Sequence, residues 1–262
     1  MMRSLDIAGT GMQAQQTNVE VIANNIANMT TTGFKRRRPE FQDLIYQDIR
    51  RAGTMSSDSG TLVPAGAQVG LGVRTAGIYR INDQGTLEQT SNSLDLAIEG
   101  RGYFQVTLPS GEYAYTRDGT FSLSDTGTIV TADGYPVSPG ITVPNNADSI
   151  TIDQTGQVQV TISGQTQSTV VGQLQMATFQ NENGLAAMGQ NLFTETQSSG
   201  NAITGTGQSV GFGSIRQGYV EESNVNVVTE ITDLITAQRA YEMNSKVITA
   251  SDEMLQTLTG LK

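Results

Sequence analysis

The chain has 262 residues, 29 glycines, a formal net charge of −10, and no Cys, His or Trp. A chain without Cys and His lacks thiolate nucleophiles, disulfides, the commonest general base and the usual zinc ligands, so these chemistries are excluded. Its length is sufficient for one or two domains with hydrophobic cores. The sequence contains no run of roughly 18 apolar residues, the length that a membrane-spanning helix needs.

The first 29 residues carry apolar side chains at alternating steps of four and three, which predicts a helix over about residues 4–29. Gly33 follows a run of threonines, and we expect it to end this helix as the C′ residue. A lone helix of this kind would not recover the entropy cost of ordering, so we expect it to order only against neighbouring copies of the chain. Arg3 and Asp6 interrupt any apolar leader, and we expect no cleaved signal peptide. The predicted seam consists of Met1, Leu5, Ala8, Met12, Val19, Ile22, Ile26 and Met29.

Residues 34–70 are predicted to form an extended linker or strap after this first zone of residues 1–33. Lys35 to Arg38 are a short basic run, which we interpret as a solvated turn rather than a nucleic-acid footprint. The segment 52–61 is small and polar, and Pro64 follows it. Two interpretations stay open, a flexible linker and a strap that neighbouring copies order.

Residues 71–215 are predicted to form a mainly antiparallel β domain. Residues 103–108 and 113–117 read as the two strands of a hairpin around a Pro-Ser-Gly turn. Residues 157–162 alternate strictly between polar and apolar side chains, which predicts a strand with one buried face. This zone should supply the independently folded core.

Asp118, Asp125 and Asp133 are the candidate carboxylates for a glycosidase-type pair. Each lies beside Gly or in a turn-like stretch, where Asp is expected for turn geometry instead. The glycine-rich segments also lack the remaining residues of a nucleotide-binding loop. We therefore expect no catalytic residue, no cofactor and no metal.

Residues 216–262 are predicted to contain a second long helix, from about 226 to 260, with Ser223, Asn224 and Asn226 as candidate caps. Two adjacent apolar stripes make its apolar face wide, which suits several neighbours at once. An alternative is that the two terminal helices pair as an intramolecular hairpin. The predicted fold is α+β, with long N- and C-terminal helices and an inserted, mainly antiparallel β domain. The stripes are Val227, Ile231, Leu234, Tyr241, Ile248, Leu255 and Leu258, and Ala240, Met243, Val247, Ala250, Met254 and Leu261.

Four separated motifs resemble the bacterial flagellar rod and hook proteins, and the resemblance extends over essentially the whole chain. Tyr46 to Arg51, with the polar stretch up to Pro64, is similar to an insertion of the distal rod branch of that family. The motifs are Ala23–Asn28 with Thr32–Lys35, Leu94–Val106, Tyr115–Gly119, and Ser223–Asn226 with Ala237–Lys246.

The resemblance implies a structural subunit of the flagellar distal rod, whose long terminal helices pack as the core of a helical tube with the inserted β domain outside it. The implied tube is a rigid hollow drive shaft that transmits torque to the hook and lets exported subunits pass. The implied partners are copies of the chain, proximal rod proteins, the hook protein, P-ring and L-ring proteins, the rod cap and the type III export apparatus. The implied location is the basal body, in a rod that spans the periplasm, with no nucleic acid bound and no embedding in the membrane. A hook protein and a proximal rod subunit are alternatives, and a peptidoglycan hydrolase is a remote one.

We expect the subunit interface to lie in the terminal segments, where Asn24, Asn25 and Asn28 would hydrogen-bond between copies and fix their register. The predicted interface residues are Leu5, Met12, Val19, Ile22, Asn24, Asn25, Ile26, Asn28, Gly33, Phe34, Leu234, Gln238, Arg239, Tyr241, Asn244, Ile248 and Leu255. The predicted rigidity strap comprises Tyr46, Ile49, Arg50, Met55, Leu62 and Pro64.

Overall fold

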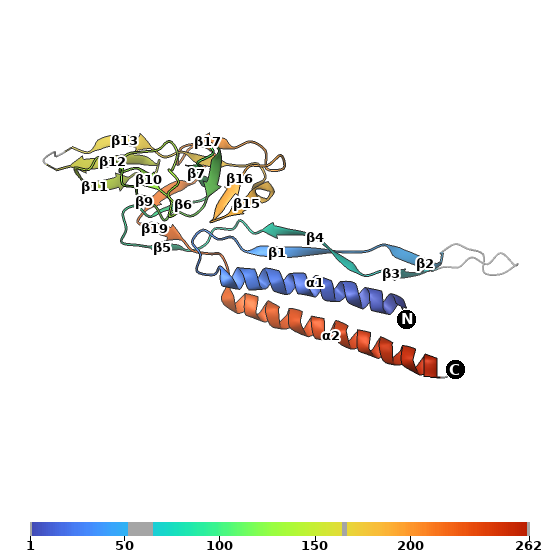
Figure 1. Ribbon diagram of the computed structural model, residues 1–262. Helices are drawn as coiled ribbons and strands as arrows, with labels where there is room; N and C mark the ends of the chain where they lie inside the picture. The colour runs from blue at the N-terminus through green and yellow to red at the C-terminus, as the bar shows by residue number, and fades with distance from the viewer. Residues whose placement is uncertain (1, 52–64, 164–166, 261–262) are drawn as a thin grey trace. The chain divides into compact units, whose positions relative to one another are not determined.

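The computed structural model describes residues 2–51, 65–163 and 167–260, which fold as two compact units (Figure 1). The first unit comprises residues 1–26, 37–79 and 226–262, and the second comprises residues 27–36 and 80–225. The chain passes from one unit to the other after residues 26, 36, 79 and 225, so each unit is assembled from distant segments. The fourfold division at residues 33, 70 and 215 follows the sequence pattern and stays a prediction.

Two long helices belong to the first unit, α1 (Met2–Ala27) and α2 (Val227–Gly260). Their bounds lie within about two residues of the predicted ones, as is usual for helix ends. Asn226 caps α2, because its Oδ1 accepts hydrogen bonds from the backbone N–H of Val228 at 3.1 Å and of Thr229 at 3.2 Å. The prediction for Gly33 is wrong, since α1 ends at Ala27, six residues earlier.

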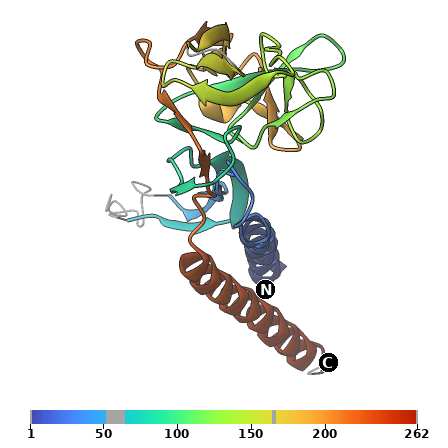
Figure 2. The same ribbon diagram turned by 90° about the vertical axis from the view of Figure 1, so that its left-hand side faces the viewer.

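The two helices pair antiparallel within the first unit (Figures 1 and 2). Ser4 Oγ lies 3.2 Å from Ser251 Oγ near one end of the pair, and Asn25 Nδ2 lies 3.1 Å from Glu230 Oε2 near the other. This is the intramolecular hairpin that the sequence left open. Tyr241, which the spacing placed on the seam, remains 44% exposed.

The first unit also contains two strand pairs. β1 (Arg37–Asp43) pairs with β4 (Val73–Arg80), and β2 (Tyr46–Arg50) pairs antiparallel with β3 (Ala67–Gly70). The described part of the predicted strap is therefore extended and hydrogen-bonded. Met55, Leu62 and Pro64 lie outside the described residues.

Among the described residues of the second unit, the largest sheet has six antiparallel strands in the order β15-β16-β8-β7-β14-β17. The predicted hairpin is its centre, with Phe104 opposite Thr116. The short helix η1 (Glu182–Gly184) precedes β15. The strands of the sheet are β7 (Tyr103–Thr107), β8 (Tyr113–Thr116), β14 (Met176–Thr178), β15 (Ala186–Gly189), β16 (Leu192–Thr194) and β17 (Ile203–Gly205).

A three-stranded antiparallel sheet and three strand pairs complete the second unit as described. The predicted strand over residues 157–162 is the middle strand of the three. The three-stranded sheet contains β11 (Ala147–Ile152), β12 (Gln157–Ile162) and β13 (Thr169–Gln173). The pairs are β5 (Leu87–Gln89) with β19 (Tyr219–Glu221), β6 (Leu96–Glu99) with β18 (Ser214–Gln217), and β9 (Ser122–Leu123) with β10 (Ile129–Val130).

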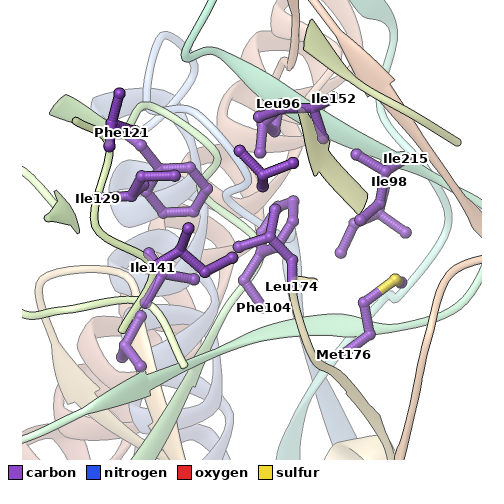
Figure 3. Packing of buried hydrophobic residues seen from close by; sticks show 14 of the residues in the cluster. Leu96, Ile98, Phe104, Phe121, Ile129, Ile141, Ile152, Leu174, Met176 and Ile215 are labelled. Atoms are coloured by element: carbon purple, nitrogen blue, oxygen red, sulfur yellow. The ribbon is translucent and has the colours of Figure 1, made fainter. Parts of the chain in front are cut away.

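The hydrophobic core of the second unit lies between these sheets and pairs (Figure 3). Alternation puts Val158 and Val160 of β12 into this core, as the sequence predicts. The rings of Phe104 and Phe121 meet edge to face with centroids 5.1 Å apart. Each such side chain contributes about 1.5–3 kcal/mol on burial, so this core can hold the second unit together. The α+β fold class is confirmed.

Candidate functional site

Three of the four motifs that carry the family resemblance, together with β19, bring four buried or half-buried polar side chains together within the second unit. We call Lys35, Arg117, Glu221 and Asn224 the junction cluster. Lys35 lies just before the chain crossing after residue 36, and Asn224 just before the crossing after residue 225. Arg117 directly follows β8, and Glu221 ends β19. The cluster therefore joins the segments through which the chain enters and leaves this unit.

Glu221 is the centre of the junction cluster, with its side chain only 1% exposed. Its Oε1 accepts hydrogen bonds from Lys35 Nζ at 2.6 Å and from the backbone N–H of Gly85 at 2.9 Å. Its Oε2 accepts from Arg117 Nε at 2.6 Å, and its backbone carbonyl accepts from the N–H of Gly33 at 2.7 Å. One residue thus holds three other segments of the chain, at residues 33–35, 85 and 117.

Arg117 uses the rest of its guanidinium on backbone carbonyls. Nη2 donates to the carbonyls of Ile98 at 3.1 Å and Gly100 at 2.5 Å, and Nη1 donates to the carbonyl of Gly102. These carbonyls belong to the end of β6 and the connection to β7. A planar guanidinium with donors on both sides suits this role, whereas a lysine could not bridge the same set.

Asn224 and Lys35 fix the segment that follows β4. The Asn224 amide donates to the carbonyls of Ile81 at 2.8 Å and Asp83 at 2.9 Å, and its Oδ1 accepts from the N–H of Arg36 at 2.7 Å. Lys35 Nζ donates to the same Asp83 carbonyl at 2.8 Å. The side-chain amide and the ammonium thus add to the backbone hydrogen bond that the Ile81 N–H donates to the Arg36 carbonyl at 2.8 Å.

Gly33 lets the segment after α1 lie directly against the end of β8. Its φ is +67°, and a Cβ at this position would lie 2.8 Å from the carbonyl carbon of Arg117. Any L side chain would therefore be strained and would collide with backbone. Glycine is needed here because the backbone of residue 33 lies close to that of Arg117, and not because a helix ends here.

Asp118 also holds the segment after α1 against the end of β8. Its Oδ1 accepts from Thr32 Oγ1 at 2.8 Å and from the N–H of Thr120 at 3.1 Å. Asp118 and Asp133 also line a cavity of about 30 Å³, which admits a water molecule but no sugar. This geometry gives Asp118 a positioning role and does not suit glycoside hydrolysis.

Burial and neighbouring charges shift the pKa values of Glu221 and Lys35 in opposite directions. Burial by itself would raise the pKa of the Glu221 carboxyl, but the Arg117 guanidinium and the Lys35 ammonium outweigh it and hold this pKa below the ordinary 4.5. Burial lowers the pKa of Lys35 from the ordinary 10.5, although the Glu221 carboxylate opposes this shift. The attraction between the two groups thus offsets part of the cost of burying each of them.

The sequence-based interpretation of the basic run is wrong for Lys35. Its side chain is 5% exposed and ion-paired, not solvated in a turn. Glu221 was missed altogether, because a glutamate beside a second glutamate carries no local signal of burial. The one signal was indirect, since Lys35 and Arg117 both lie in motifs that carry the family resemblance.

The first unit has a polar cluster of its own, which we call the helix clamp: Asn25, Arg37 and Glu230. Asn25 is 1% exposed, its Oδ1 accepts from the backbone N–H of Arg37 at 2.9 Å, and its Nδ2 donates to the Arg37 carbonyl at 2.9 Å. The same Nδ2 donates to Glu230 Oε2 at 3.1 Å. Glu230 lies in the first turn of α2, where the helix dipole favours a carboxylate. The clamp ties the end of α1, the start of β1 and the start of α2 together.

The predicted interface residues are divided between the two units. Asn28, Gly33 and Phe34 belong to the second unit, and the others belong to the first. Ile22, Asn25 and Gly33 are buried, whereas Asn24, Gln238, Arg239 and Tyr241 are exposed. The remaining ones, half-buried, are Leu5, Met12, Val19, Ile26, Asn28, Phe34, Leu234, Asn244, Ile248 and Leu255.

The part of the chain that the structure describes holds no group of three or more Asp or Glu side chains arranged to bind a metal ion. Within the same residues, neither α1 nor α2 is apolar enough to cross a membrane.

Replacing Glu221 by Gln should lower the free energy of unfolding by about 3–5 kcal/mol at pH 7, because it leaves Lys35 and Arg117 buried without their counter-charge. The folded-state pKa of Glu221 is below its unfolded value, so this stabilisation is present above pH 4.5 and is lost as the pH falls through the folded-state value. Urea unfolding of both proteins from pH 7 to pH 3 should therefore show two curves that converge on the acid side.

The control is Glu222→Gln, which removes the same charge from the exposed neighbouring side chain. It should change the free energy of unfolding by less than about 0.5 kcal/mol. Equal stabilities of the two variants at pH 7 would contradict the central role of Glu221.

Family models match three parts of the chain. A model described as "Flagella basal body rod protein" matches residues 5–35, and one described as "Flagellar hook protein FlgE/F/G D1 domain" matches residues 97–160. A third, "Flagellar basal body rod FlgEFG protein C-terminal", matches residues 216–261. The matched regions include all four members of the junction cluster, and they include Asn25 and Glu230 of the helix clamp but not Arg37.

Relatives match the chain over nearly its whole length. "Flagellar basal-body rod protein FlgG" of Caulobacter vibrioides is 59% identical over 261 residues, which cover 100% of both chains. The proteins of the same name from Agrobacterium fabrum and Bacillus subtilis are 52% and 41% identical, and the matches cover 97% and 100% of this chain and the same shares of those chains. The chain belongs to the flagellar basal-body rod protein family, in its distal rod branch, and is a structural subunit of the rod.

Proposed function

We propose that the chain polymerises into a straight, rigid, hollow tube that carries torque from the motor to the hook and leaves a channel for exported subunits. The observation that carries this proposal is the apolar surface of α2. Met243, Val247 and Met254 are 64%, 46% and 49% exposed, although the helix belongs to a compact unit. Copies of the same chain would cover these side chains in a polymer.

The spacing of these residues supports contact with a neighbouring helix. Val247 and Met254 are one heptad apart, and Met243 lies one turn before Val247, so the three share one flank of α2. A monomer that leaves such side chains in water gives up about 1.5–3 kcal/mol for each of them. A repeated head-to-tail contact between identical subunits would recover that free energy and would generate a helical filament.

The β2–β3 pair supplies the proposed rigidity strap. Tyr46 and Ile49 are 54% and 63% exposed, and a two-stranded ribbon is only marginally stable by itself. Packing of Tyr46, Ile49 and Arg50 against an adjacent copy would stabilise the ribbon and would also stop subunits from sliding. Met55, Leu62 and Pro64 complete the proposed strap in the part of the chain outside the described residues.

The remaining parts of the proposal concern setting and partners. The subunit would leave the cytoplasm through the flagellar export apparatus without cleavage and would assemble under the rod cap. Its tube would span the periplasm between proximal rod proteins and the hook protein, inside the P and L rings. The chain would act by packing and not by catalysis. Of the predicted interface residues, the exposed Gln238, Arg239 and Tyr241 of α2 are those best placed to meet another copy.

Concentrated protein should form straight hollow tubes that are visible by electron microscopy. Replacing Val247 and Met254 by Ser should raise the critical concentration for assembly at least about tenfold, since each buried apolar side chain is worth about 1.5–3 kcal/mol. The matched control is Lys246→Ser with Glu253→Ser, one residue earlier at both positions, which leaves the net charge unchanged. Curved polymers from the unaltered chain would indicate a hook protein instead, and equal effects of the two double variants would contradict the α2 contact.

Deleting residues 46–64 should leave tubes that assemble but are curved or pliable, because the contact that prevents sliding is gone. The persistence length of the tubes, measured on electron micrographs, is the readout. Tubes as straight as those of the full chain would reject the proposed rigidity strap.

A further inference from the structure

Two lines of small or polar residues face each other along the α1–α2 pair. Seven residues make nearly two turns of an α-helix, so residues at that spacing lie along one line of its surface. We call these two sets the polar lines. On α1 the line is Ser4, Gly11, Asn18 and Asn25, and on α2 it is Glu230, Ala237, Asn244 and Ser251.

Two hydrogen bonds and one close approach, called the three contacts below, show that the polar lines meet in a single register. Ser4 Oγ lies 3.2 Å from Ser251 Oγ, and Asn25 Nδ2 lies 3.1 Å from Glu230 Oε2. A Cβ on Gly11 would lie 3.0 Å from Asn244 Nδ2, so the backbone of α1 passes close to that amide. The two residue numbers add up to 255 in every case, as one antiparallel register requires.

Apolar side chains alone would not select this register. Val227, Leu234, Tyr241, Ile248 and Leu255 recur at heptad spacing beside the α2 line, and all of them except Tyr241 are half-buried. A shift of seven residues would bring four of these five to the place of another member of the set. The same shift would set Asn25 opposite Ala237 and separate its amide from the buried Glu230 carboxylate. Polar groups that lose a buried partner cost free energy, so the polar lines distinguish between registers that the apolar residues do not.

We propose that the polar lines make α2 of the same chain the partner of α1, in the register defined by these three contacts, and so reserve the Val247 and Met254 flank of α2 for other copies. The helix clamp supports pairing within one chain, because Asn25 holds the backbone of Arg37 and the Glu230 carboxylate at the same point. The reserved flank rests on the proposed polymer, whereas the register does not. Asn25 is a positioning residue for this register.

The absence of cysteine from the chain allows a direct test by disulfide formation. The two matched double variants are Ser4→Cys with Ser251→Cys, and Gly11→Cys with Asn244→Cys. The two crossed variants recombine the same four substitutions as Ser4→Cys with Asn244→Cys, and Gly11→Cys with Ser251→Cys. Each single substitution therefore occurs once in each set, and the comparison of the two variants that contain Ser4→Cys is free of the contact between a side chain at residue 11 and Asn244.

Under mild oxidation of dilute protein, the matched pairs should close at least about tenfold faster than the crossed pairs, because one heptad displaces the sulfurs by roughly 10 Å along the helix. Non-reducing electrophoresis should show the closed product at monomer size. Equal rates in the two sets would overturn the register, and matched products at dimer size would overturn pairing within one chain.

Asn25→Ala added to both sets tests the positioning role, with Asn24→Ala as the control at the exposed neighbouring position. Asn25→Ala should raise the closure rate of the crossed pairs relative to the matched pairs, and Asn24→Ala should not. A uniform change in both sets would reject a register role for Asn25. Matched closure in a protein that forms no tubes would sustain the register and reject the proposed polymer.

Discussion

The burial of the Glu221 carboxylate between Lys35 and Arg117 is the constraint on which the second unit depends. A carboxylate that is 1% exposed is tolerable only when opposite charges and hydrogen-bond donors surround it, and here two cations and a backbone N–H do so. Lys35 precedes Glu221 by 186 residues, so the pair closes only after both ends of the chain have come together. The cluster thus links completion of the unit to the presence of both terminal segments.

Apolar and polar side chains have different roles in this chain: apolar ones form the core, and buried polar ones determine which segments meet. Apolar residues form the core of the second unit, and others remain exposed on α2. Buried polar groups, in the junction cluster and in the helix clamp, set which segments meet and in what register. This division suits the polymer proposed above, because its subunits would need one fixed shape and an apolar surface left for their neighbours.

Local features were predictable from the sequence, whereas contacts between distant segments were not. The Asn226 cap, the hairpin over residues 103–117 and the buried face of β12 follow from capping, turn chemistry and alternation over a few residues. The sequence-based interpretations of Gly33 and Lys35 were wrong because the contacts that explain them are made with distant residues. Gly33 lies against the backbone of Arg117, and Lys35 pairs with Glu221. Asn25 was recognised as important, but the structure shows its bonds within the chain, and a role between copies stays a prediction.

Hydrogen exchange at two backbone amides tests the junction cluster most directly. The N–H groups of Gly33 and Gly85 donate to the Glu221 carbonyl and carboxylate. In the full chain at neutral pH, both amides should exchange as slowly as those of the central hairpin strands β7 and β8. Exchange of either amide at the rate of an unprotected peptide, while the hairpin stays protected, would contradict the account.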